Sequence, residues 1–148
     1  MIILGSDHAG FELKETVKKH LEQRGDEYKD LGAFSIDPVD FAVIAQKVCK
    51  EVLKCGDDLG LLFCGTGVGI SIAANKVKGI RAACCSDYFS AKLTRIHNNA
   101  NILCLGGRVV GTGLACSLVD IFIETKFCGE ERHQRRIDQI TQIENSNL

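Results

Sequence analysis

The order of apolar and amphipathic segments is the feature that most constrains the fold of this chain. Short apolar runs predict strands at residues 1–6, 59–64, 81–86 and 102–105, and a weaker run predicts one at 27–31. Helical periodicity predicts helices at residues 11–23, 41–53, 68–76, 88–97, 114–126 and 131–144. Strand and helix alternate, and the strands are continuously apolar. The sequence therefore predicts an α/β fold, with a five-stranded parallel sheet covered by helices on both faces.

The length and composition of the chain are those of one globular domain spanning residues 1–148. A formal net charge of -1 gives no basic excess for nucleic acid or for an anionic membrane surface. No stretch approaches the roughly 20 consecutive apolar residues of a membrane span. Met1 leads directly into apolar residues, without the basic segment of a signal peptide. We therefore expect a cytoplasmic protein with no nucleic-acid or membrane partner.

The eight cysteines are expected to be reduced thiols. Six of them lie inside apolar runs and are predicted to be small core residues, namely Cys49, Cys64, Cys84, Cys85, Cys104 and Cys116. Cys84 and Cys85 are adjacent, so in a strand they point to opposite faces. No pair has the CxxC spacing, which gives a zinc site or a thioredoxin-like motif little support.

The loop after Cys64 carries the strongest chemical signal. In a parallel sheet between helices, ligands bind beyond the carboxyl ends of the strands. Cys64 ends a predicted strand, and three glycines follow it in the loop at residues 65–69. Such a loop can turn its N–H groups inward to hold an anion, and the next helix adds positive potential at its N-terminus. Both effects favour a thiolate at Cys64, which could act as a nucleophile or a base. The alternative is a buried structural thiol.

The spacing of this loop excludes three familiar phosphate-binding motifs. A GxGxxG fingerprint needs glycine at position 70, and a cysteine phosphatase loop needs arginine there, but the residue is Ile70. No Lys-Ser or Lys-Thr follows, as a nucleotide-triphosphate P-loop requires. The remaining interpretation is a hole for an oxyanion that develops during a reaction.

Other polar residues gather near predicted strand ends. Asp7 and His8 follow the first strand, where Asp7 either caps a helix or contacts a ligand. Arg108 follows a pair of glycines at another strand end and could contact a phosphate. His97 and Asn98 lie just before a strand, where a core histidine and a turn-forming asparagine are the alternatives.

Arg132 and Arg136 are spaced i, i+4 in the last predicted helix, so their guanidinium groups share one face. Such a pair can grip a phosphate, although a solvated charged face is the commoner role.

Five sequence blocks resemble one known family. GSDHAG, CGTGVGISIAANK, GIRAA, HNNANILCLGGR and RHQRR occur in the order found in type B ribose-5-phosphate isomerases, of the ribose/galactose isomerase family. The likeness runs from residue 2 to about residue 143. It implies a Rossmann-like three-layer α/β/α fold with an extra C-terminal helix, and a homodimer or homotetramer. It also implies a phosphosugar substrate and no metal or other cofactor. The implied reaction interconverts ribose 5-phosphate and ribulose 5-phosphate.

The resemblance also implies roles for the matching residues. Cys64 would be the general base that moves a proton between C1 and C2. The enediolate oxygens would be held by Asn98 and by the loop amides of Gly65, Gly67, Val68 and Gly69. Ring opening would be assisted by Thr66 and His97, and the sugar would contact Asp7. The phosphate would contact His8, Arg108, Arg132 and Arg136. The last two would reach across from the neighbouring subunit, on which the helix at residues 131–144 would pack.

Two positions distinguish this chain within the family that it resembles. Some members carry a glutamate base in the helix after the loop, but Ile70 occupies its place here, which puts the chain in the cysteine branch. Members commonly show Tyr-Pro-Asp followed by Tyr or Phe before the second helix. This chain has Asp37-Pro38-Val39-Asp40-Phe41, so the aromatic ring there has no hydroxyl group.

Several alternatives remain open from the sequence. Related isomerases act on allose 6-phosphate or galactose 6-phosphate, the latter as pairs of unlike subunits. A protein that binds a sugar phosphate or a nucleotide without catalysis would share the anion-binding loop. A thiol redox protein is a third option, with no resolving cysteine at CxxC spacing from Cys64.

Overall fold

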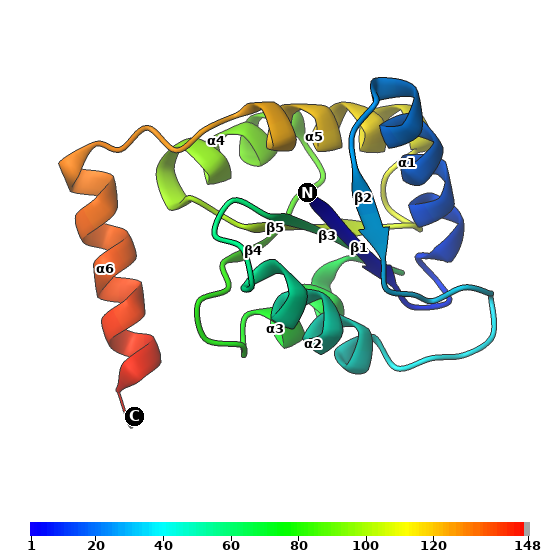
Figure 1. The fold of residues 1–148 in the computed structure, drawn as a ribbon, viewed down its shortest axis with the longest axis horizontal. Coiled ribbons are helices and arrows are strands. Elements are labelled where there is room, and N and C mark those ends of the chain that lie inside the picture. The colour runs from blue at the N-terminus through cyan, green and yellow to red at the C-terminus, as the bar shows by residue number, and fades with distance from the viewer. Residues whose placement is uncertain (147–148) are drawn as a thin grey trace.

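The computed structural model describes residues 1–146 and contains a five-stranded, all-parallel sheet in the order β2-β1-β3-β5-β4 (Figure 1). The strands are β1 (Ile2–Ser6), β2 (Tyr28–Asp30), β3 (Leu59–Cys64), β4 (Ala82–Cys84) and β5 (Ile102–Gly106). The predicted α/β class, the parallel sheet and its five strands are confirmed. Strands β1, β3 and β5 form the buried centre, because their residues are apolar toward both faces.

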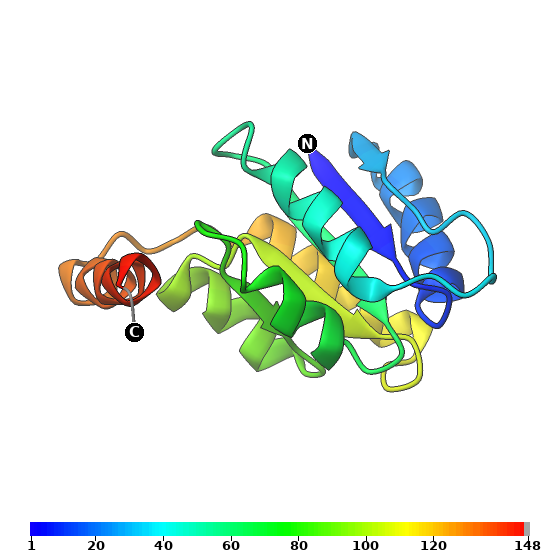
Figure 2. The same ribbon diagram turned by 90° about the horizontal axis from the view of Figure 1, so that it is seen from below.

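Helices cover both faces of the sheet, which gives the expected three layers (Figures 1 and 2). One layer contains α1 (Phe11–Arg24), α4 (Tyr88–Asn98) and α5 (Thr112–Glu124), and the other contains α2 (Phe41–Val52) and α3 (Val68–Ala74). The last helix, α6 (Glu131–Asn145), stands apart beyond the amino-terminal edge of the sheet and touches the C-terminal end of α4. None of the helices within residues 1–146 is long and apolar enough to cross a membrane.

The predicted elements are all present, and the differences lie at their ends. Strand β4 is shorter than expected, and α3 ends at Ala74 rather than at Lys76. Asn75 accounts for the end of α3, because its side chain leaves the helix and exchanges two hydrogen bonds with the backbone of Ala82, at 2.8 and 2.9 Å. Helix α5 starts at Thr112, two residues before the first apolar side chain that marked it in the sequence.

The prediction that six cysteines are core residues is correct for four of them. Cys49, Cys64, Cys85 and Cys104 are buried. Cys84 is exposed and Cys116 is half-buried. Cys84 lies at the end of β4, and β4 is an edge strand that has a neighbour on one side only. All eight cysteines are free thiols, as expected.

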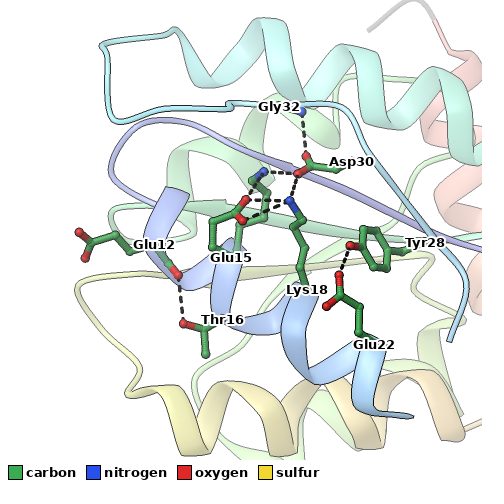
Figure 3. Close-up of polar contacts among 9 residues, drawn as sticks. Glu12, Glu15, Thr16, Lys18, Glu22, Tyr28, Asp30 and Gly32 are labelled. Atoms are coloured by element: carbon green, nitrogen blue, oxygen red, sulfur yellow. Dashed lines mark hydrogen bonds and ion pairs between the residues drawn. The ribbon is translucent and has the colours of Figure 1, made fainter. Parts of the chain in front are cut away.

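A charged cluster joins α1 to the edge strand β2 (Figure 3). The side chain of Lys14 is fully buried, and its ammonium group pairs with Asp30 and, at 3.2 Å, with Glu15. Lys18 pairs with the same two carboxylates, at 2.9 and 3.0 Å. Asp30 also accepts a hydrogen bond from the N–H of Gly32 at 3.0 Å. This cluster therefore fixes the chain where it leaves β2 for the loop that leads to α2.

Candidate active site

Three loops meet at the carboxyl-terminal edge of the sheet, as the sequence predicts. The register pairs Ser6 with Phe63 and Cys64 with Gly106, so β1, β3 and β5 end at the same level. Backbone hydrogen bonds then join the loops. The N–H of Asp7 donates to the carbonyl of Phe63 at 3.1 Å, and the N–H of Arg108 donates to the carbonyl of Gly65 at 3.0 Å. The loops after the three strands therefore form one continuous surface.

The loop after β3 wraps around the sulfur of Cys64. The N–H of Gly67 donates a hydrogen bond to Cys64 Sγ at 3.1 Å. The N–H of Val68 donates to Thr66 Oγ1 at 3.2 Å. The N–H groups of Gly65 and Thr66 donate to no partner within residues 1–146, so they can serve an added anion.

Two glycines make this tight loop feasible. Gly67 has a left-handed backbone with φ of 79°, which side chains rarely adopt. Gly106 lies so close to the loop that an added Cβ would come within 2.6 Å of the carbonyl carbon and oxygen of Thr66. The walls of the loop are therefore main-chain atoms.

Three of the predicted contact residues lie on the neighbouring loops that meet at this edge of the sheet. The guanidinium of Arg108 lies over Gly65, with Nη1 at 3.3 Å from the position that a Cβ on Gly65 would take. Asp7 is buried and accepts a hydrogen bond from the N–H of Gly10 at 3.0 Å, so it stabilises the turn into α1. His8 is exposed, and its Nδ1 accepts a hydrogen bond from the N–H of Val39 at 3.3 Å. That bond links the first loop to the loop before α2.

Phe41, the first residue of α2, forms another border. Its ring carbons lie 3.1 to 3.4 Å from the position of a Cβ on Gly69. The ring is 40% exposed, so it presents an apolar face beside the loop that follows Cys64. Whatever occupies the loop meets a ring without a hydroxyl group at this side.

The remaining predicted residues form a second group at the opposite edge of the sheet. His97 and Asn98 end α4, and Arg81 Nε donates to the carbonyl of Asn98 at 3.0 Å, just before β4 begins. The amino-terminal pair Gly60–Ile102 is four residues away from the pair Cys64–Gly106, which corresponds to about 13 Å along the strands. Within one chain, this group therefore does not meet Cys64.

Helix α6 adds its arginines to this second group. The ring of His133 stacks on that of His97, with centroids 4.4 Å apart and planes inclined by 8°. Arg132 Nε pairs with Glu130 at 2.9 Å, and both side chains are exposed. A cavity of about 670 Å³ lies at the same edge, lined by residues of α6 and of the segments around β4. Its apolar lining includes Ile80, Ile140 and Ile143.

Cys84 borders the Cys64 loop, although it was predicted to be a core residue. Its Sγ is 3.7 Å from the carbonyl oxygen of Thr66 and 2.9 Å from the position of a Cβ on Gly67. Burial raises the pKa of the Cys84 thiol, and the charge of a Cys64 thiolate raises it further. In the sequence, the adjacency of Cys84 and Cys85 indicates only that their side chains point to opposite faces of a strand.

The arrangement at the carboxyl-terminal edge places the Cys64 thiol beside loop N–H groups that have no partner within the described residues. Arg108 adds a positive charge beside them. Such a combination suits removal of a proton next to a carbonyl group, since the charge that develops on the carbonyl oxygen can be stabilised.

The sequence matches the ribose/galactose isomerase family over residues 2–140. It is 48% identical over 143 residues to ribose-5-phosphate isomerase B of Escherichia coli (strain K12), covering 97% of this chain and 95% of that protein.

Solved structures agree with the sequence match. Ribose-5-phosphate isomerase B of Clostridium thermocellum is 46% identical, with a TM-score of 0.92, over 97% of this chain and 96% of that one. The Mycoplasma genitalium enzyme with bound ribulose-5-phosphate is 43% identical, with a TM-score of 0.93, over 99% of this chain and 97% of that one.

Proposed function

This chain belongs to the ribose/galactose isomerase family, and we propose that it interconverts ribose 5-phosphate and ribulose 5-phosphate through an enediolate. The E. coli relative bears the name ribose-5-phosphate isomerase B, and the M. genitalium relative binds ribulose-5-phosphate. The observation that carries the proposed mechanism is the hydrogen bond from the N–H of Gly67 to Cys64 Sγ, beside the N–H groups of Gly65 and Thr66, which have no partner within residues 1–146.

The proposed reaction moves one proton between neighbouring carbons. Cys64, as thiolate, takes the proton from C2 of the open-chain aldose, and the C1 carbonyl oxygen becomes the negative enediolate oxygen. The thiol then returns the proton to C1, while the hydroxyl on C2 loses its proton to the oxygen on C1 and becomes the ketone. The loop amides from Gly65 to Gly69, with Asn98, stabilise the enediolate. This stabilisation is needed because a proton next to a carbonyl is only weakly acidic.

The remaining side chains open and hold the sugar. Thr66 and His97 assist opening of the ring by moving the proton of the C1 hydroxyl, and Asp7 contacts the sugar. The phosphate is bound at the far end of the substrate by His8, Arg108, Arg132 and Arg136. Fixing the phosphate orients C1 and C2 toward Cys64, which makes the proton transfer effectively intramolecular.

We infer that two copies of the chain complete each site as a homodimer, or as a tetramer of such pairs. The groups that carry Cys64 and His97 lie at opposite edges of one sheet, so a partner has to supply the second group. Helix α6 offers an apolar surface for this pairing, because Ile140 and Ile143 are 46% and 67% exposed. Arg132 and Arg136, on the same helix, then act across the interface together with His97 and Asn98.

An NMR incubation in D2O tests the reaction and the substrate together. The chain is mixed in turn with ribose 5-phosphate, allose 6-phosphate and galactose 6-phosphate. Deuterium at C2 of ribose 5-phosphate and at C1 of ribulose 5-phosphate is the expected result. Deuterium exchange with a 6-phosphate sugar alone would show that the chain catalyses the proposed proton transfer on that sugar and not on ribose 5-phosphate. Binding of a sugar phosphate without any deuterium exchange would instead indicate a sugar-phosphate-binding protein, and would contradict the proposed isomerase activity.

A further inference from the structure

Three side chains at the junction between α5 and α6 bring metal-binding atoms together. Cys128 Sγ, a carboxylate oxygen of Glu130 and a ring nitrogen of His133 all lie within 4.8 Å of one another. Thiolate, carboxylate and imidazole are the donors that zinc binds in proteins. Zinc–ligand bonds of about 2.0–2.3 Å in a tetrahedral site place the donors about 3.5 Å apart. Small side-chain rotations are therefore enough to close the site.

The backbone of this junction is already fixed. The N–H of Cys128 donates to the carbonyl of Ile96 at 3.2 Å, which ties the segment to α4. Gly129 turns the chain with φ of 70°, and the N–H of Glu130 then approaches Cys128 Sγ at 3.5 Å. The N–H of His133 donates to the carbonyl of Glu130 at 3.0 Å. The backbone that carries the three donors is thus held in place by hydrogen bonds to α4 and within the junction itself.

His133 is the buried member of the set. The residue is 6% exposed, and its ring makes no hydrogen bond within residues 1–146, although it stacks on His97. A ring that makes no hydrogen bond and lies beside a thiol and a carboxylate is the observation that points to a ligand.

The contact between Glu130 and Arg132 does not block the site. It joins Arg132 Nε to one carboxylate oxygen, Oε2, and both side chains are more than half exposed. Exposed ion pairs contribute little free energy, so Glu130 can turn its carboxylate toward a cation. The other two donors carry no competing ion pair within the described residues.

We propose that Cys128, Glu130 and His133 bind a zinc ion, with water as the fourth ligand, and that the ion links the segment after α5 to the first turn of α6. Within one chain this site lies at the opposite edge of the sheet from the Cys64 loop, and it adjoins His97 and Arg132, which the proposed function places in the partner's substrate site. Zinc binding is therefore measured directly and not through turnover, so its failure can be told apart from a failure of the proposed reaction.

Metal titration of the purified, metal-free full chain tests this proposal. Zinc binding is measured by calorimetry, and Co²⁺ serves as a coloured probe, because a thiolate ligand gives an intense near-ultraviolet band. We expect one ion per chain, and at least about tenfold weaker zinc binding in both Cys128→Ser and Glu130→Gln. Both residues are exposed, so these variants should keep the fold, which circular dichroism checks.

Cys55→Ser is the matched control, because Cys55 is also an exposed free thiol but lies after α2, outside the cluster. It should bind zinc as the wild type does and keep the cobalt band. The proposal is overturned if the wild type binds no zinc at micromolar concentrations. It is equally overturned if Cys128→Ser keeps the wild-type affinity and the cobalt band.

Discussion

The backbone N–H of Gly67 points at the sulfur of Cys64 and donates a hydrogen bond to it across 3.1 Å. The donor belongs to the peptide that leads into α3, so the position of the helix and the position of the sulfur are physically linked. The same turn leaves the N–H groups of Gly65 and Thr66 without partners in the described chain. The sulfur and these two N–H groups thus lie on one stretch of backbone.

Replacing Cys64 by alanine should remove turnover and leave substrate binding nearly unchanged. General bases contribute about 10²–10⁴-fold to rate, so kcat should fall by that factor, while KM follows the phosphate contacts and stays close to the wild-type value. Steady-state kinetics with ribose 5-phosphate measure both quantities. Cys116→Ser, in α5, is the control and should behave as wild type. Near-normal turnover in Cys64→Ala would mean that the base is another group.

Gly67→Ala should destabilise the protein through its backbone. A left-handed conformation disfavours a Cβ by roughly 1–2 kcal/mol, and this Cβ would lie 2.9 Å from Cys84 Sγ and 3.0 Å from the carbonyl carbon of Leu105. We expect about 2–3 kcal/mol less free energy of unfolding in urea titrations. Gly113→Ala, in α5, meets no atom within 4 Å and should be neutral or stabilising by up to about 1 kcal/mol. Equal effects at both positions would contradict this account.

Mixing two inactive variants should restore activity if each site combines two chains. In a dimer of Cys64→Ala with Arg136→Ala, one site has lost both groups and the other has both intact. Random exchange makes half of the dimers mixed, and half of their sites are intact, so about a quarter of the wild-type activity should return. The assay is turnover before and after subunit exchange. An absence of recovery, with exchange verified by mass spectrometry, would place both groups of a site in one chain.

Asp30 should make stability depend on pH. Burial raises the pKa of Asp30, but hydrogen bonds from Lys14, the N–H of Gly32 and Lys18 outweigh burial and bring it below the usual 3.8. The folded-state pKa is the lower one. Ionised Asp30 therefore gives its full stabilisation above the unfolded value, and this is lost as the pH falls through the folded value. Urea titrations of the wild type should show this acid loss.

In the variant Asp30→Asn, the free energy of unfolding should decrease less as the pH falls than it does in the wild type. The substitution should also reduce the free energy of unfolding near pH 7 by about 3 kcal/mol, because the buried Lys14 loses a partner. Glu12→Gln, on the exposed side of α1, is the control and should retain the wild-type dependence. If Asp30→Asn loses stability at low pH as steeply as the wild type, other carboxyl groups determine the pH dependence of the free energy of unfolding.

The sequence predicted the β3–loop–α3 unit well, because an apolar run, a cysteine and three glycines are local signals. It also indicated that His97 and Asn98 precede a strand, which accounts for their position at the amino-terminal edge. Periodicity does not reveal which strand lies at the edge of a sheet, so the exposure of Cys84 was missed. The Cys128–Glu130–His133 cluster was missed for a related reason. Its spacing is not CxxC, and its buried histidine depends on the stacking of α6 against α4.

The crowding around Gly106 restricts how such a site can diverge. A methyl group on Gly106 would collide with the main chain of Thr66. The close contact between these two backbone segments therefore requires glycine at position 106. Phe41 and Cys84 approach the same loop from other elements, and only their side chains are in contact with it. A change of sugar specificity would therefore come from substitutions at Phe41 and Cys84, whereas the main chain at Thr66 and Gly106 stays the same.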